Sequence, residues 1–383
     1  MQASPPNGRR LQAGEFALWA FAFGASSLYL VGRCLLSLLA WTTGWNGINP
    51  STIWMGAILL ACMAHVYTHI DRQRIAFLPI LVSILPRRYL SYLIGYLMRL
   101  PIPFAKLRRA IYRAWCWKYT VDIAEIIVDL DAYPSLEAFF IRPVNLALRP
   151  SFSSMGDGLN SFKYIGPRDC LIAPADSVLS ALGNFSTACM STVPCKGLSF
   201  SATDLLHGST DESIDFRKGK TTVLHWAVFY LSPGDYHHFH APCNFTVHEC
   251  RHLGGDLWPV NDTFMQRVKG LLAANERVVL IGTHMVGGEE LFFAYVAVGA
   301  LNVGSIYIHK YSLETHKDML SPTSESSLTR TESYSIGEEV GFFSLGSTVV
   351  LVYELPLSIQ PNYIMNSQDK VHVGMPFVQV ATT

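Results

Sequence analysis

Ser347 follows Gly346 at the start of a valine-rich run, residues 348–352, and is the first side chain that could do chemistry. A hydroxyl directly after a flexible glycine could reach back to the carbonyl of that glycine. Serine is a weak nucleophile, so such an attack would require a base. Taken alone, the Leu-Gly-Ser-Thr stretch is typical of an ordinary turn before a strand, because valine favours strands.

A second candidate stretch is the histidine cluster at His237, His238 and His240. Three histidines in four positions first suggest a zinc site. However, alternate residues of a strand share a face while neighbours do not, and no second cluster at ligand spacing follows. We therefore expect no metal here. A metal-binding β protein, and histidines hydrogen-bonded within a loop, are the alternatives.

The third stretch is Ala-Pro-Ala-Asp-Ser at 173–177, where Asp176 lies in a Pro-led turn after an apolar run. Alone, this pattern is typical of an Asx-turn. The three stretches are far apart in the chain, so only a folded domain could bring them together.

The region that would position these residues, 148–383, predicts a β-rich domain with few helices. Short apolar runs alternate with Gly, Pro and Asn, as expected for strands and turns. These runs are 169–185, 223–233, 245–255, 277–288, 290–310 and 347–356. Residues 312–335 are rich in Ser and Thr and lack a core pattern, which predicts an exposed, mobile insertion.

The N-terminal part predicts a membrane anchor. After a short polar tail or targeting stub at 1–15, residues 16–70 contain two apolar runs. The first run, 16–41, would span ~39 Å as a helix, more than the ~30 Å hydrocarbon core. The second, 53–67, is shorter and predicts either a second span or a helix lying in the interface.

Residues 71–147 predict basic amphipathic helices at the membrane surface. Ten Lys or Arg residues and no acidic residue fall between positions 72 and 118, interleaved with Leu, Ile, Tyr and Trp. Proline residues at 86, 101 and 103 separate the helices. Basic amphipathic helices attract anionic lipid surfaces. The alternative is that these helices pack on the protein's own core.

Composition narrows the function classes. The 383-residue chain has a formal net charge of zero and 15% charged residues, which does not indicate a nucleic-acid-binding protein. Half of its residues are hydrophobic. Its eight cysteines include no C-x-x-C pair, so we interpret them mostly as buried thiols.

Motifs in a fixed order resemble the phosphatidylserine decarboxylase family over roughly residues 78–356. They are LPRRYLSYLIGYLMRLPIP, LEAFFIRPV, APADSVL, KGLSFSATDLL, DYHHFHAPCN, GDLWPVN, NERVV, VAVGALNVGSI and GEEVGFFSLGSTVV. One position departs from the family pattern. Ser177 stands where the family usually has glycine after the aspartate, which predicts strain if that position needs a positive φ.

The resemblance implies self-cleavage between Gly346 and Ser347. Ser347 Oγ would attack the Gly346 carbonyl, while His240 accepts the hydroxyl proton and Asp176 orients the imidazole. β-Elimination and hydrolysis with loss of ammonia would convert Ser347 into a pyruvoyl group. The products would be a β chain, 1–346, and an α chain of 383 − 346 = 37 residues.

The same resemblance implies the substrate and the setting. The pyruvoyl carbonyl would form a Schiff base with phosphatidylserine, releasing carbon dioxide and phosphatidylethanolamine. His237 is implied in substrate binding or proton transfer. The cleaved α chain, 347–383, would stay bound to the β chain, and a homodimer is plausible. The alternative is a membrane-anchored relative that no longer processes.

The expected fold is therefore α+β: a mainly antiparallel β catalytic domain preceded by membrane-associated helices and an N-terminal transmembrane helix. The resemblance favours the mitochondrial inner membrane. An endomembrane or a bacterial inner membrane is the alternative location.

Overall fold

The computed structural model describes residues 82, 86–155, 162–185, 200–207, 221–301, 305–315 and 326–380. The chain divides into two compact units, Met1–Leu78 and Pro79–Thr383, and the described residues all belong to the second. The predicted tail at 1–15 and anchor at 16–70 lie outside them. Within the described residues, no helix is long and apolar enough to cross a membrane.

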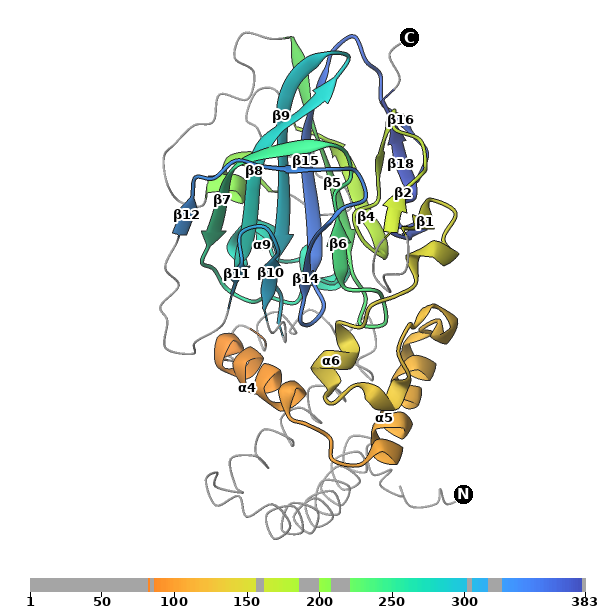
Figure 1. Ribbon diagram of the computed structural model, residues 1–383. Helices are drawn as coiled ribbons and strands as arrows, with labels where there is room; N and C mark the ends of the chain where they lie inside the picture. Colours follow the sequence, from red (N-terminus) through yellow and green to blue (C-terminus); the bar gives the residue numbers. More distant parts are fainter. Residues whose placement is uncertain are drawn as a thin grey trace, which may run out of the picture. The chain divides into compact units, whose positions relative to one another are not determined.

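The centre of this second unit is a nine-stranded sheet in the order β12-β7-β8-β9-β15-β5-β4-β17, with β13 also paired to β7 (Figure 1). Its pairings are antiparallel. The strands are β4 (Ser177–Asn184), β5 (Thr222–Tyr230), β7 (Phe245–Leu253), β8 (Arg277–Val286), β9 (Glu289–Val298), β12 (Ser326–Leu328), β13 (Glu332–Tyr334), β15 (Thr348–Pro356) and β17 (Lys370–Val371). The prediction of a mainly antiparallel α+β fold is confirmed for the described residues.

Strand β15, which begins directly after Ser347, is an interior strand of this sheet. It pairs with β5 on one side and β9 on the other, so that Thr348 lies opposite both Tyr230 and Val298. Its residues from Thr348 to Leu355 are all buried. A strand buried on both faces reads as a continuous apolar run, which explains the valine-rich sequence after Ser347.

A smaller sheet in the order β11-β10-β14-β6 packs on the large one. It consists of β6 (His238–His240), β10 (Ile306–Ile308), β11 (Leu313–Glu314) and β14 (Glu339–Phe343). The ring of Phe239 lies 4.7 Å from that of Phe343 and 5.7 Å from that of Tyr295 on β9, in one buried core. Residues 344–347 therefore connect two packed sheets.

Two further small sheets complete the β structure. One has the order β16-β18-β3, formed by Asn362–Tyr363, Pro376–Gln379 and Cys170–Ile172. The other pairs β1 (Phe152–Ser154) with β2 (Phe162–Tyr164). Strands β16, β17 and β18 all lie in the predicted α chain, so that segment pairs with strands from before residue 185.

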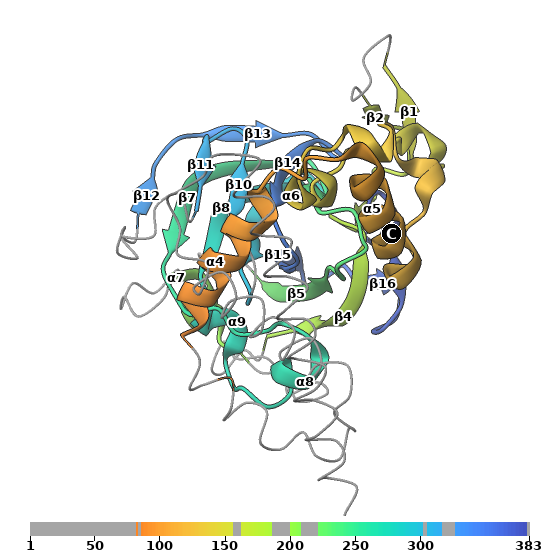
Figure 2. The ribbon, with the colours of Figure 1, turned by 90° about the horizontal axis from the view of Figure 1, so that it is seen from below.

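The basic region forms helices α4 (Arg87–Arg99) and α5 (Ala105–Tyr119), separated at Pro101 and Pro103 as predicted. Helix α6 (Leu136–Phe140) begins at Ser135, whose side chain accepts a hydrogen bond from the amide of Ala138. Figures 1 and 2 both show α6 between α4 and α5. These helices belong to the same compact unit as the strands, so the boundary expected at 147/148 does not separate two units.

The remaining helical elements are short. They are α7 (Ala202–His207), α8 (Asp262–Met265), α9 (Leu271–Ala274) and the 3-10 turns η2 (Ile123–Glu125), η3 (Leu130–Ala132) and η4 (Leu146–Leu148).

The interval predicted as a mobile insertion, 312–335, contains strands within its described residues. It contains β11, β12 and β13, on either side of residues 316–325, which lie outside the described part of the chain. Tyr334 is 2% exposed and its ring stacks on Phe245 at 5.1 Å. Strands β12 and β13 add to the edge of the sheet at β7. An edge strand pairs through its backbone groups and does not need an alternating apolar pattern. Composition therefore did not reveal these strands.

Candidate active site

Ser347 lies in a buried turn between the two packed sheets. It is fully buried, and its hydroxyl donates a hydrogen bond to the carbonyl of Val298 on β9. Its own carbonyl accepts a hydrogen bond of 2.9 Å from the amide of Leu231, just after β5. Ser347 is thus held, through its hydroxyl and its own carbonyl, by residues of β9 and of the chain just after β5.

His237 is the histidine that lies against this peptide. A Cβ placed on Gly346 would be 3.6 Å from His237 Nε2 and 3.6 Å from the carbonyl oxygen of Leu231. His237 Nδ1 lies 2.8 Å from the carbonyl oxygen of Asp235, which can only accept, so Nδ1 carries the proton. Nε2 then carries a lone pair, and it has no hydrogen-bond partner among the described residues.

Burial keeps the His237 ring neutral. The side chain is fully buried, and desolvation lowers the pKa of His237 to about 3. A neutral imidazole with a free lone pair beside Gly346 can accept a proton without first losing one.

His240 lies three positions after His237, at the end of β6, and has different partners. Its Nδ1 donates to the carbonyl of Gly337 at 2.9 Å, and its Nε2 lies 3.2 Å from the hydroxyl of Tyr236. Because Nδ1 carries the proton, Nε2 accepts from the Tyr236 hydroxyl. Burial lowers the pKa of His240 as well. Both ring nitrogens of His240 are therefore engaged.

His238 has yet another set of partners. Its Nδ1 lies 2.6 Å from Glu339 Oε1, and its Nε2 lies 2.9 Å from the carbonyl oxygen of Ile141 at the end of α6. The three histidines thus diverge. Across the described part of the chain, no group of three His, Cys, Asp or Glu side chains is arranged to hold a metal ion.

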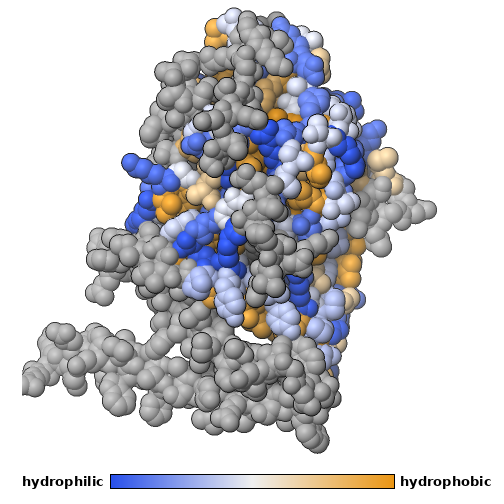
Figure 3. All heavy atoms as spheres, turned by 90° about the vertical axis from the view of Figure 1, so that its left-hand side faces the viewer, coloured by the Kyte–Doolittle hydropathy of each residue, from blue (hydrophilic) through white to orange (hydrophobic). Residues whose placement is uncertain are grey.

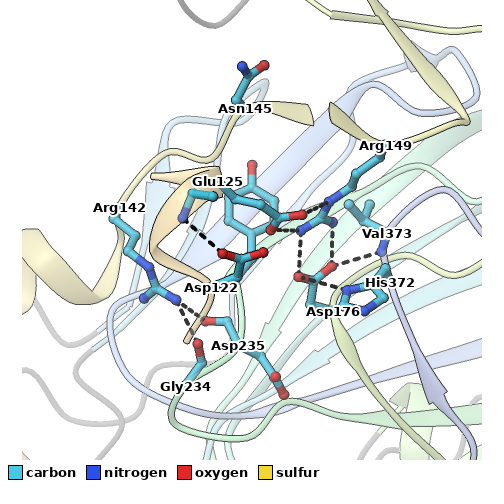
Figure 4. A network of polar contacts seen from close by, with 12 residues as sticks. Asp122, Glu125, Arg142, Asn145, Arg149, Asp176, Gly234, Asp235, His372 and Val373 are labelled. Carbon is cyan, nitrogen blue, oxygen red and sulfur yellow. Dashed lines mark hydrogen bonds and ion pairs between the residues drawn. The ribbon is translucent and has the colours of Figure 1, made fainter. Parts of the chain in front are cut away.

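Asp176 is buried in a polar network that sequence reasoning did not find (Figure 4). Arg149 donates to it twice, from Nη1 at 2.6 Å and from Nη2 at 2.8 Å. The amide of Val373 donates at 2.9 Å, and His372 Nδ1 lies 3.5 Å away. Burial alone would raise the pKa of Asp176, but Arg149 and these hydrogen bonds hold it well below its usual range.

Arg149 joins this network to the helical region. It binds Glu125 through Nε at 3.2 Å and Nη2 at 2.8 Å, while holding Asp176. Its partners are 24 and 27 positions away in sequence, so no local pattern could reveal the network. Arg142 was missed for the same reason, because its partner Gly234 is 92 positions away.

Two groups of predicted site residues emerge from these contacts. His237, Gly346 and Ser347 lie together at the predicted cleavage site. Asp176 is fixed by Arg149 and by the predicted α chain, and it is linked to His240 through the backbone, where the His240 amide donates to the carbonyl of Pro174 at 2.7 Å. The side-chain relay from Asp176 through His240 to Ser347 stays a prediction.

Ser177, the departure from the family pattern, is accommodated without strain. It begins β4, is fully buried, and donates from its hydroxyl to the carbonyl of Ala175 at 3.1 Å. The non-glycine residues with positive φ in the described ranges are Thr120, Ser312 and Gln368. The strain considered for Ser177 is therefore not observed, because the position is extended strand.

The sequence was compared with models of known protein families. Residues 136–379 match the phosphatidylserine decarboxylase family. The chain belongs to the phosphatidylserine decarboxylase family. The resemblance predicted from sequence motifs is thereby confirmed, and the match to the decarboxylase family includes Asp176, His237, His240 and Ser347.

Individual phosphatidylserine decarboxylases are similar over most of the chain. A mitochondrial phosphatidylserine decarboxylase proenzyme of Rattus norvegicus is 34% identical, over 76% of this chain and 71% of the relative. The mitochondrial proenzyme 1 of Oryza sativa subsp. japonica is 31% identical, over 72% and 70%. A proenzyme of the bacterium Brevibacillus brevis is 31% identical, over 72% and 89%.

Proposed function

We propose that this chain is a phosphatidylserine decarboxylase that cleaves itself between Gly346 and Ser347. The observation that carries the proposal is the buried Gly346–Ser347 peptide beside the free Nε2 of His237, in a member of this family. The relatives are named proenzymes, which supports processing. Ser347 as the precursor of a pyruvoyl group fits its buried position beside the neutral imidazole of His237.

The processing step would begin when Ser347 Oγ exchanges its hydrogen bond to Val298 for one to a base. The alkoxide oxygen then attacks the carbonyl carbon of Gly346, and the C–N bond breaks to give an ester. β-Elimination releases the Gly346 carboxylate and leaves dehydroalanine at 347. Water converts this enamine to a ketone and ammonia, so the new α chain begins with a pyruvoyl group.

His240 is proposed as the base of this step, with Asp176 as its orienting carboxylate. For this role the Tyr236 hydroxyl must release His240 Nε2, because that nitrogen is its hydrogen-bond acceptor. Arg149 keeps Asp176 ionised, which is the state that can stabilise an imidazolium.

His237 is proposed to bind the substrate carboxylate or to transfer protons during decarboxylation. The pyruvoyl group supplies a ketone that binds the substrate amine and accepts the electron pair left when carbon dioxide departs. His237 Nε2 lies beside the place where this group would form, and burial keeps it unprotonated. It is thus positioned to take up a proton and return it to carbon.

The lipid substrate is proposed to be reached from an anionic membrane surface through α5. This helix buries Tyr112 and Cys116 and exposes Leu107 and Trp117 by 47% and 85%, and Phe104, directly before it, is 67% exposed. On the face seen in Figure 3, by contrast, hydrophilic and hydrophobic side chains of the described residues are interspersed. Exposed apolar residues next to lysines and arginines are typical of interfacial helices.

The two mitochondrial relatives support the mitochondrial inner membrane as the location, and the bacterial relative keeps a bacterial membrane as the alternative. The β chain, 1–346, and α chain, 347–383, are proposed to stay associated, since β17 and β18 pair with β4 and β3. A homodimer is part of the same proposal.

Intact-mass measurement of the purified chain, combined with a decarboxylation assay on phosphatidylserine vesicles, tests this function. We expect two fragments, a ketone at the N-terminus of the smaller one, and formation of phosphatidylethanolamine. A single full-length chain, or a small fragment that begins with a free serine, would contradict the proposal.

A further inference from the structure

The loop that carries His237 is seated on the helical region, not only on the sheets. Trp115 Nε1 on α5 donates to the carbonyl of Pro233 at 3.2 Å. Gly234 approaches α5 so closely that a Cβ there would lie 2.5 Å from the carbonyl oxygen of Tyr119. The ring of Phe140 on α6 lies 4.0 Å, centroid to centroid, from the ring of His237.

Arg142, directly after α6, makes the strongest of these contacts. Its side chain is 2% exposed, and Nη2 donates to the carbonyl of Gly234 at 2.6 Å and reaches that of Asp235 at 3.5 Å. Burial of a guanidinium carries a considerable free-energy cost, which these bonds offset only in part, because Nε and Nη1 have no hydrogen-bond partner among the described residues. Arg142 therefore anchors the Gly234 carbonyl and lies at the limit of hydrogen-bond distance from the Asp235 carbonyl.

The Asp235 carbonyl is also the acceptor of the His237 Nδ1 proton. The position of this one carbonyl thus decides which ring nitrogen is protonated and where Nε2 points. We infer that Arg142 is a positioning residue for His237: by anchoring the Gly234 carbonyl and contacting that of Asp235, it keeps the Nε2 lone pair directed at residues 346–347. This inference rests on the role proposed for His237 in turnover.

Arg142 also contributes through its charge. Burial is the largest cause of the lowered pKa of His237. Among titratable groups, Arg142 and His238 lower this pKa further, and Asp176 raises it. Removing the guanidinium would relax the ring and withdraw a positive charge from it. Both changes raise the pKa of His237, so the acidic limb of the activity profile should move to higher pH.

The test compares Arg142→Gln with Arg142→Lys and a control, Arg330→Gln. Arg330 also donates to a backbone carbonyl, that of Lys310, and pairs with Glu332, so these partners lie outside α5 and the 232–237 loop. In Arg142→Gln we expect normal cleavage, kcat reduced about 10- to 100-fold with little change in KM, and an acidic limb shifted upward by about one pH unit. Arg142→Lys should restore part of the kcat and part of the pH profile, and Arg330→Gln should match the wild type.

Several outcomes would overturn the inference. Wild-type kcat in Arg142→Gln would do so, and so would a lower kcat with an unshifted pH profile, which indicates general loosening. Loss of cleavage in a folded Arg142→Gln chain would assign Arg142 to processing instead.

Ring-¹⁵N NMR of the processed wild type gives a test that needs no Arg142 variant. The ring signals of His237 are identified by their loss in His237→Gln. We expect His237 to carry its proton on Nδ1. A proton on Nε2 would refute the role inferred for Arg142. Failure of the proposed function itself would appear separately, as a wild-type chain that neither cleaves nor decarboxylates.

Discussion

Arg149 and Asp176 form a buried, bidentate ion pair, with Nη1–Oδ1 and Nη2–Oδ2 distances of 2.6 and 2.8 Å. The same guanidinium binds Glu125 of the helical region, while Asp176 accepts from the amide of Val373 in the predicted α chain. One ion pair therefore connects the helices, the β domain and the C-terminal segment.

Replacing Arg149 with glutamine should destabilise the protein strongly. The change leaves the Asp176 carboxylate buried without its counter-charge, and breaking such a pair costs about 3–5 kcal/mol. Denaturant unfolding of the purified variants measures this difference. Arg109→Gln is the control, because Arg109 pairs with Asp131 at an exposed position and its loss should change stability by less than about 1 kcal/mol. Equal stability of the two variants would contradict the structural role of the buried pair.

Ser347→Ala should remain a full-length chain in intact-mass spectra, because no hydroxyl is available to attack Gly346. His240→Gln should slow cleavage by about 100-fold or more, as expected for loss of a general base. His248→Gln is the matched control, since His248 is exposed and contacts only the Thr283 hydroxyl among the hydrogen bonds of the described residues. Cleavage of His240→Gln at the wild-type rate would remove His240 from the processing step.

His237→Gln should separate processing from turnover. We expect it to cleave and to form the ketone, but to lose decarboxylation by at least about 100-fold, because the free Nε2 beside residues 346–347 is gone. Mass spectrometry and the vesicle assay on one preparation measure both properties. If His237→Gln failed to cleave while His240→Gln cleaved normally, the two histidine roles would have to be exchanged.

Stability should fall as pH is lowered from 7 to 5. Burial lowers the pKa of His225 and His284 to about 4 and that of His237 to about 3. In the unfolded chain these groups titrate near ~6.5, so the unfolded state binds protons first as pH falls. Their contribution is complete above about pH 6.5 and is lost toward about pH 4, at about 2 kcal/mol per histidine by pH 5.

His372 opposes this trend. A hydrogen bond to Asp176 raises its pKa, so its contribution is present below about pH 6.5 and is lost as pH rises through the folded pKa. The His372 side chain is 41% exposed, so its contribution to the free energy of unfolding is smaller than that of the buried histidines. Unfolding free energies at pH 5 and 7 test the net sign, and His284→Gln should flatten the dependence. A protein equally stable at both pH values would refute the prediction.

Trp117→Ala should weaken binding to vesicles that contain anionic lipid by about tenfold, because a nearly fully exposed indole would otherwise be buried at the interface. Co-sedimentation at low and high salt measures the apolar and electrostatic parts separately. Met285→Ala is the control, since Met285 is 62% exposed on β8, away from α5. Equal binding of both variants would argue against α5 as the docking element.

Local patterns were sufficient to predict the central strands and the basic helices. The valine-rich run after Ser347 predicted β15, and the basic region divided by prolines predicted α4 and α5. These features depend on strand propensity and on proline positions within a few residues, which is why sequence reveals them. The ordered strands within 312–335 escaped prediction because their pairing partner, β7, lies far away in the chain.

The sequence by itself determined that a serine follows a glycine at the start of a buried strand, and that histidines and an aspartate accompany it in the order typical of one family. Only the tertiary structure decided that His237 faces Gly346, that His240 is engaged by Tyr236 and Gly337, and that Arg149 holds Asp176. The reason is that side-chain direction and ion pairing depend on strand register and on packing between segments distant in sequence, which no local pattern encodes.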